Sequence, residues 1–123
     1  MKNIYVSHSK EFNYQDELYN LIRNSELNTL FNIILPHETN TEQFNSKDFL
    51  KNECYVFVIE ASYPTIGSGI EAGWANAYEI PIITIYKKGF KLKGSIKSIS
   101  TEVIEYSSYD DLIIKLKDVL ERI

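Results

Sequence analysis

Hydrophobic residues occur along the chain in short runs, separated by segments in which they recur at helical spacing. Two runs, 54–61 and 80–88, are apolar without alternation, as expected for strands buried on both faces of a sheet. Further short apolar runs predict strands at 3–7, 31–36 and 101–106. Helical spacing predicts helices at 11–27, 46–53, 69–78 and 108–123, the second capped by Ser46 and the last by Ser108.

This alternation of strands and helices indicates a single α/β domain over residues 1–123. It predicts a flavodoxin-like or Rossmann-like three-layer α-β-α fold around a parallel sheet of about five strands. A basic stretch, 89–99, reads as a loop with at most a helical turn. In such folds ligands bind beyond the carboxyl ends of the strands. The segments expected to hold a site are therefore 7–14, 36–48, 61–71 and 87–97.

Composition narrows the classes of partner. Of the 123 residues 44% are hydrophobic, enough for a real core, and the net charge is −4. Lys and Arg form no stripe, which argues against binding nucleic acid through its phosphates, and no apolar run is long enough to span a membrane. The single cysteine, Cys54, excludes an internal disulfide and is expected to be buried. With no signal-peptide pattern at the N-terminus, we expect a cytoplasmic protein.

Three of the five glycines, Gly67, Gly69 and Gly73, lie within seven residues after the third predicted strand. A glycine-rich turn between a strand and a helix can hold an anion on free backbone N–H groups, and Thr65 and Ser68 add hydroxyls there. The spacing G-x-G-x-x-x-G is neither a Rossmann fingerprint nor a P-loop. The segment therefore predicts an anion site of no familiar type.

Glu71 is the one acidic residue among these glycines, and we expect it in the first turn of the helix. The helix dipole would favour its ionised form there, which suits a nucleophile; the alternative is a residue that only caps the helix. Gly73 is expected to allow close packing of helix on sheet. Trp74 and Tyr78 share the face of Glu71, either as walls of a base or sugar pocket or as core aromatics.

The segment from Ser62 to Ala75, SYPTIGSGIEAGWA, resembles the signature of the nucleoside 2-deoxyribosyltransferase family. It is closest to the 2′-deoxynucleoside 5′-phosphate N-hydrolase branch, whose pattern is T-x-P-S-L-G-V-G-Y-E-L-G-x-A. The proline, both turn glycines, the glutamate, the helix glycine and the alanine coincide. The resemblance covers about 30 residues, including the preceding strand, and the order of strands and helices is compatible over nearly the whole chain.

The resemblance implies that Glu71 attacks C1′ of a deoxynucleoside or nucleoside, or of its 5′-monophosphate, and expels the base. Thr65 and Gly67 match the positions that hold a 5′-phosphate. Thr65 stands where the hydrolases have serine, so hydrolysis is favoured over transfer to a second base. The family also takes a polar residue from the neighbouring subunit of a homodimer, about 24 positions after the glutamate, where this chain has Ser95. We expect no cofactor and no metal.

The chain departs from the family pattern in places. Tyr55 stands where the family has an aspartate, and Asp48, the candidate second catalytic acid, precedes Glu71 by 23 positions where the family has 24 to 26. A glycine-rich first loop is replaced by SHSKEFNY, in which His8 could donate to a base or phosphate, as could His37 after the second strand. The predicted substrate-binding residues are Tyr5, Ser7, His8, His37, Thr65, Gly67, Ser68, Gly69, Trp74 and Ser95.

Two other functions remain open from the sequence. The start of the chain, IYVSHSKEF, resembles the opening strand of TIR domains, whose NAD-cleaving members also use a glutamate on a helix, although they lack the glycine pair. A nucleotide-binding module that keeps the pocket but has no catalytic activity is also not excluded by the sequence.

Overall fold

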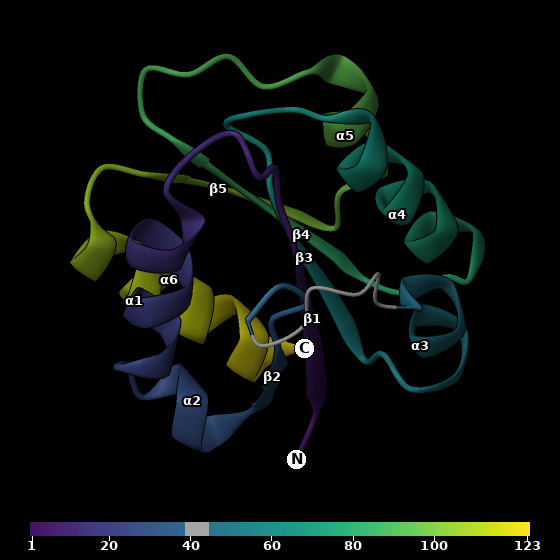
Figure 1. The fold of residues 1–123 in the computed structure, drawn as a ribbon, viewed down its shortest axis with the longest axis horizontal. Helices are drawn as coiled ribbons and strands as arrows, with labels where there is room; N and C mark the ends of the chain where they lie inside the picture. The colour runs from purple at the N-terminus through teal and green to yellow at the C-terminus, as the bar shows by residue number, and fades with distance from the viewer. Residues whose placement is uncertain (39–44) are drawn as a thin grey trace.

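The computed structural model describes residues 1–38 and 45–123 and is built around a five-stranded, all-parallel sheet (Figure 1). The strand order is β2-β1-β3-β4-β5, so the chain starts near the middle of the sheet. The strands are β1 Asn3–Ser7, β2 Asn32–Ile34, β3 Val56–Glu60, β4 Ile82–Lys87 and β5 Glu102–Tyr106. Parallel neighbours need crossover connections, and helices provide them.

Helices cover both faces of the sheet, which gives the three predicted layers (Figure 1). One face carries the π-helical turn η1 Gln15–Tyr19, α1 Asn20–Arg23, α2 Leu27–Leu30 and α6 Tyr109–Arg122. The other carries α3 Ser46–Asn52, α4 Ile66–Ala77 and α5 Gly94–Ile99. The predicted fold class is confirmed.

The alternation of side chains along each strand divides the core into two clusters. In β3 all five residues are buried: Val56 and Val58 face α1 and α6, whereas Phe57 and Ile59 face α3 and α4. Burial on both faces explains why this run is apolar without a period of two. The last residue of β3, Glu60, is buried too but is charged instead of apolar, and it lies at the carboxyl edge of the sheet.

The predicted helix 11–27 is wrong as a single element. The chain turns at Asn24, and the Ser25 hydroxyl donates to the Ile22 carbonyl oxygen at 2.7 Å while accepting from the Leu27 N–H at 3.3 Å. A serine side chain that bonds the backbone in this way competes with helix propagation. The pattern of apolar residues continues across the break, which is why periodicity alone missed it.

One other helix has a different cap from the one predicted, and another begins at a different residue. The N-cap of α3 is Asn45, whose side chain accepts from the Asp48 N–H, so Ser46 is the first helical residue. Helix α4 begins at Ile66 and not Gly69, which makes Glu71 its sixth residue, in the second turn. The dipole argument for Glu71 is therefore wrong, because the helix dipole acts mainly on the first turn. The cap of α6 is Ser108, as predicted.

The expected packing role of Gly73 is also wrong. Gly73 is exposed, and a Cβ built on it would meet no atom within 4 Å in the part of the chain that the structure describes. Cys54 is half-buried; burial raises the pKa of its thiol to about 12, and the thiol donates to the Val56 carbonyl oxygen. This cysteine is therefore an unreactive structural residue.

Because Gly73 is a glycine in an exposed helix interior, we predict that Gly73→Ala raises the free energy of unfolding by about 0.5–1 kcal/mol. Urea denaturation of both proteins measures the difference. Gly89, which has φ 93°, is the matched control: there alanine is strained, and the same measurement should show a loss of stability. A loss of stability at Gly73 itself would show that its bare surface is used in a contact.

Candidate active site

The carboxylate of Glu71 is held by two hydroxyls from β1. The Tyr5 hydroxyl donates to Glu71 Oε2 at 2.6 Å, and the Ser7 hydroxyl donates to Oε1 at 2.8 Å. Tyr5 and Ser7 are two positions apart on one strand, so both side chains point to the face that α4 covers. Each carboxylate oxygen thus has its own donor, and the group is fixed in orientation while remaining half-exposed.

The electrostatics favour a permanent donor at Tyr5. Burial raises the pKa of the Tyr5 phenol well above its ordinary value, and the charge of Glu71 and its hydrogen bond raise it further. A side-chain contact with Ser46, at the start of α3, acts in the opposite direction. The Tyr5 hydroxyl therefore stays protonated at neutral pH and donates a hydrogen bond to the Glu71 carboxylate. Ser46, expected only as a helix cap, is a neighbour of the site that the sequence did not reveal.

The start of α4 presents an open backbone beside this carboxylate. Thr65 caps the helix: its hydroxyl oxygen accepts from the Ser68 N–H at 3.3 Å and lies 3.0 Å from the Ser68 hydroxyl. The N–H groups of Ile66 and Gly67 have no carbonyl partner within the helix. Cβ atoms added at Gly67 or Gly69 would meet no atom of the described residues within 4 Å, so a ligand can approach closely.

His8 belongs to a buried chain of hydrogen bonds that links the loops after β1 and β2. Its Nδ1 lies 2.7 Å from the Ser9 carbonyl oxygen, which can only accept, so Nδ1 carries the proton. Its Nε2 lies 2.6 Å from the Tyr19 hydroxyl, which in turn accepts from the His37 N–H at 3.1 Å. In the neutral ring Nε2 carries no proton and therefore accepts a hydrogen bond from the Tyr19 hydroxyl. Both ring nitrogens are thus engaged within the chain and are not available to a base or phosphate.

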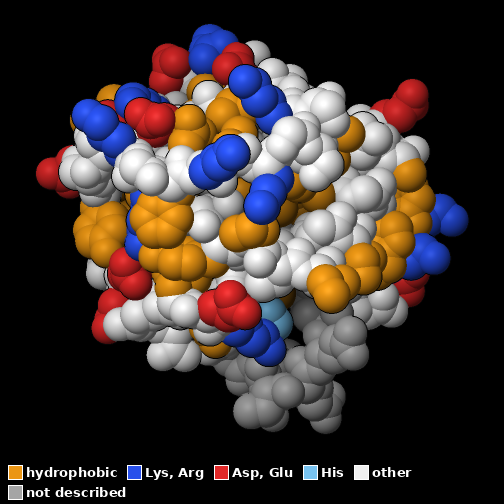
Figure 2. Space-filling view, turned by 90° about the horizontal axis from the view of Figure 1, so that it is seen from above, with side chains coloured by type: hydrophobic (Ala, Val, Ile, Leu, Met, Phe, Trp, Pro, Cys, Tyr) orange, Lys and Arg blue, Asp and Glu red, His pale blue; other side chains and the backbone are white. Residues whose placement is uncertain are grey.

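Burial lowers the pKa of His8 to about 4, so the neutral tautomer is the form at physiological pH. Burial also lowers the pKa of His37, which is half-buried. Both histidines and Tyr19 feel the charge of Glu71, which places them on the same side of the molecule as the carboxylate. Figure 2 looks onto this edge, where a histidine ring reaches the surface.

Aromatic rings surround His8 on several sides. The Tyr14 ring lies 4.7 Å from it, the Tyr19 ring 5.0 Å, and the His37 ring 5.5 Å, measured between centroids. Phe12 presents an edge to the same ring at 6.1 Å. The sequence showed more tyrosines than a core needs but did not show which of them meet here, because these contacts join separate loops.

Some predicted site residues lie apart from this group. Asp48 is exposed, and its carboxylate accepts from the Asn45 amide at 3.0 Å, so its observed contacts are those of a helix cap. Trp74 is half-buried against the second core cluster, with Lys47 Nζ 5.8 Å from its ring centroid, which supports the core alternative. Tyr55 is 46% exposed at the opposite, amino-terminal end of β3. Ser95 is exposed in the first turn of α5, and its role in a partner's site stays a prediction.

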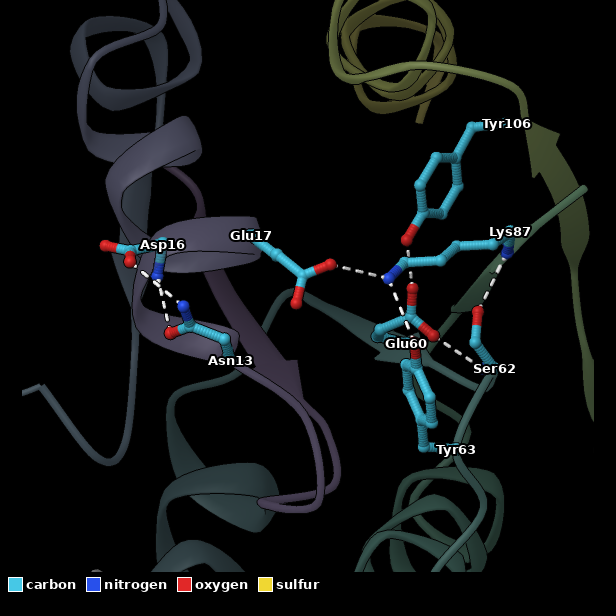
Figure 3. A network of polar contacts seen from close by, with 8 residues as sticks. All are labelled: Asn13, Asp16, Glu17, Glu60, Ser62, Tyr63, Lys87 and Tyr106. Carbon is cyan, nitrogen blue, oxygen red and sulfur yellow. Dashed lines mark hydrogen bonds and ion pairs between the residues drawn. The ribbon is translucent and has the colours of Figure 1, made fainter.

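A second polar network lies at the same edge on the other face of the sheet (Figure 3). Glu60 is buried; it accepts from the Ser62 N–H at 2.5 Å and from the Tyr106 hydroxyl. Burial raises the pKa of Glu60. Above it, Lys87 Nζ forms an ion pair with Glu17 at 2.8 Å. Sequence analysis did not identify this network; its one signal is that two apolar strands each end in a charged residue.

The described residues, 1–38 and 45–123, contain no group of three or more His, Cys, Asp or Glu side chains able to hold a metal ion. Among the helices of those same residues, none has the length and apolar character needed to cross a membrane.

Comparisons with known proteins identify the fold. No protein-family model matches the sequence, and no curated protein is significantly similar to it. The CMP N-glycosidase BcmB of Clostridium botulinum is similar in structure, with a TM-score of 0.70, 19% sequence identity, and coverage of 96% of this chain and 99% of that one. A conserved protein from Enterococcus faecalis V583 has a TM-score of 0.72 and 17% identity, with 97% and 99% covered. At these identities the likeness establishes the three-layer fold.

The burial of His8 makes the free energy of unfolding depend on pH. The folded pKa is about 4 and the ordinary value is 6.5, so between these pH values the unfolded chain binds a proton that the folded chain does not. The free energy of unfolding should therefore rise from pH 4 to 6.5, by up to about 3 kcal/mol from this group. Urea denaturation across this range measures it.

The variant His8→Gln isolates this contribution. It should be less stable at pH 7, because the link to Tyr19 is altered, yet its stability should change less between pH 6.5 and 4. His37→Gln is the matched control and should remove a smaller part of the dependence, since His37 is more exposed. Equal pH dependence in the wild type and His8→Gln would show that His8 is not held neutral.

Proposed function

We propose that this protein hydrolyses the N-glycosidic bond of a nucleoside 5′-monophosphate, with Glu71 as the nucleophile. The observation that carries the proposal is the Glu71 carboxylate, oriented by Tyr5 and Ser7 beside an open helix start. The structural likeness to a CMP N-glycosidase and the resemblance of residues 62–75 to the nucleoside 2-deoxyribosyltransferase signature support the same reaction class.

In this mechanism a Glu71 oxygen attacks C1′ as the bond from C1′ to the base nitrogen breaks. The bonding electrons leave with the base, and a covalent glycosyl ester forms through an oxocarbenium-like transition state. Water then attacks C1′, which releases the sugar phosphate and the free carboxylate, and the proton that this water loses balances the proton that the departing base takes up from solvent. Tyr5 and Ser7 hold the carboxylate in its attacking orientation, and their hydrogen bonds stabilise the charge that returns when the ester is cleaved.

The 5′-phosphate is assigned to the start of α4. The Gly67 N–H lies in the first turn of α4, which the Thr65 hydroxyl caps, and the positive end of the helix dipole favours an anion there. The base is assigned to the aromatic group of Tyr14 and His37, because stacking on ring faces tolerates a planar base. His8 supports this wall through Tyr19 instead of binding the base. A catalytic role for Asp48 stays a prediction.

We further propose that the working form is a homodimer in which Ser95 reaches the partner's site. The exposed face of α4 supports this arrangement. Ile66 is 84% exposed, and Ile70, one turn later on the same stripe, is 50% exposed. A second copy of the chain that covers this apolar face would remove it from water, which stabilises a dimer.

The assignment of Glu71 as the nucleophile can be tested by substitution. Glu71→Ala and Glu71→Gln should each lower base release by at least about a thousandfold, since the covalent step is lost. Tyr5→Phe should lower it by about ten- to a hundredfold, the value of one hydrogen bond to a charged group. Base release is measured by chromatography on a panel of nucleosides, their 5′-monophosphates and NAD. Glu79→Gln, an exposed residue just after α4, is the control and should stay active.

Other outcomes are informative. Base release that survives both Glu71 substitutions would contradict the nucleophile assignment. Cleavage of NAD alone would favour the TIR-like function, and no cleavage of any compound would favour a non-catalytic nucleotide-binding module. Adding a free second base distinguishes the reactions, because a hydrolase yields sugar phosphate whereas a transferase yields a new nucleotide.

The dimer prediction can be tested by mixing inactive chains. Glu71→Ala and Ser95→Ala should each be impaired alone. If Ser95 acts in the partner's site, mixed dimers contain one intact site each, and random mixing should restore roughly a quarter of the wild-type activity. No restoration, with mixed dimers confirmed by native mass spectrometry, would place Ser95 outside the partner's site.

A further inference from the structure

Lys87, the last residue of β4, joins three segments of the chain that lie far apart in sequence. Its Nζ donates to Glu17 Oε1 at 2.8 Å and to the Tyr63 hydroxyl at 3.1 Å (Figure 3). Its backbone N–H donates to the Ser62 hydroxyl at 2.8 Å. One residue thus binds η1 and the segment after β3 at the same time.

Aromatic rings enclose the same ammonium group. Nζ lies 5.0 Å from the centroid of the Tyr63 ring, 5.4 Å from that of Phe12 and 6.0 Å from that of Phe90. Phe12 and Tyr63 are stacked on each other, with centroids 4.8 Å apart and an angle of 14° between the rings. Cation–π contacts and a stacked pair therefore fix the loop after β1 against the loop after β3.

The groups beneath Lys87 are also held in place by hydrogen bonds. Glu60 lies beneath Lys87 and is bonded to the Ser62 N–H and the Tyr106 hydroxyl, so the ends of β3 and β5 are tied together. The positive charge of Lys87 acts on Glu60 as well as on Glu17. Removing the charge of Lys87 would therefore leave Glu17 and Glu60 without their neighbouring cation.

The segments that Lys87 holds are those that carry the proposed binding surfaces. Glu17 lies two residues before Tyr19, which bonds both His8 and the backbone of His37. Phe12 meets the His8 ring edge-on. Tyr63 lies two residues before Thr65, the cap of α4. The hydrogen bonds that orient Glu71, by contrast, come from Tyr5 and Ser7 on the other face of the sheet.

We propose that Lys87 is a positioning residue, which fixes the loop after β1 relative to the glycine-rich start of α4 and thereby sets the distance between the surfaces proposed to bind the base and the 5′-phosphate. This inference rests on the proposed function, because those two surfaces are the ones assigned above. Lys87 affects binding through the loops and does not take part in bond cleavage.

The test compares Lys87→Met, which keeps the length and removes the charge, with Lys87→Arg, which keeps both charge and ring contacts. Lys88→Met, an exposed neighbour, is the matched control. For the best substrate of the panel, Lys87→Met should raise KM about tenfold, from the loss of an ion pair and cation–π contacts, and change kcat less than about threefold. Lys87→Arg and Lys88→Met should resemble the wild type.

Hydrogen–deuterium exchange gives a second measurement that needs no substrate. Lys87→Met should exchange faster in the segments 9–19 and 62–66, with β1, β3 and α4 beyond them unchanged. If no panel compound is cleaved by the wild type, the proposed function fails, and this exchange pattern still decides whether Lys87 positions the two loops.

Three results would overturn the inference. Unchanged exchange in both segments would show that Lys87 does not hold them. Faster exchange throughout the chain would show a general contribution to stability. A fall in kcat with KM unchanged would place Lys87 in the chemical step, contrary to a role confined to the loops.

Discussion

A carboxylate that is partly removed from water must be hydrogen-bonded, and the site is organised around how this requirement is met for Glu71. Its two donors, Tyr5 and Ser7, lie on one face of β1, so helix α4 has to pack where its sixth residue can reach them. Val6, which lies between these two donors, and His8, which follows Ser7, then necessarily face the other helical layer. One short strand thus fixes both the nucleophile and the support of the aromatic wall.

The fold could be predicted because it depends on short-range patterns. Unbroken apolar runs identified β3 and β4, and alternation with helices identified the parallel sheet, whose carboxyl edge holds the site. The position of Glu71 was predicted for a partly wrong reason. Gly67 and Gly69 suggested a turn, so the helix was expected to start after them; Thr65 caps it earlier, and both glycines are helical.

The contacts that could not be predicted join residues distant in sequence. Lys87 and Glu17 are separated by 70 positions, and Tyr19 bonds His8 on one side and the backbone of His37 on the other. Such pairs are created by the register of the sheet and by the place where a helix breaks, neither of which leaves a periodic signal. The break after Arg23 matters most, because it lets the chain return to the sheet edge after only two short helices.

Two glutamates lie at the carboxyl edge, and their surroundings decide which of them can act. Glu60 is 1% exposed, and its carboxyl oxygens accept from the Ser62 N–H and the Tyr106 hydroxyl, so a substrate cannot reach it. Burial raises the pKa of Glu60. Glu71 is half-exposed, and the Tyr5 and Ser7 hydroxyls orient its carboxyl group without covering it. The same residue type therefore serves structure on one face of the sheet and is available for chemistry on the other.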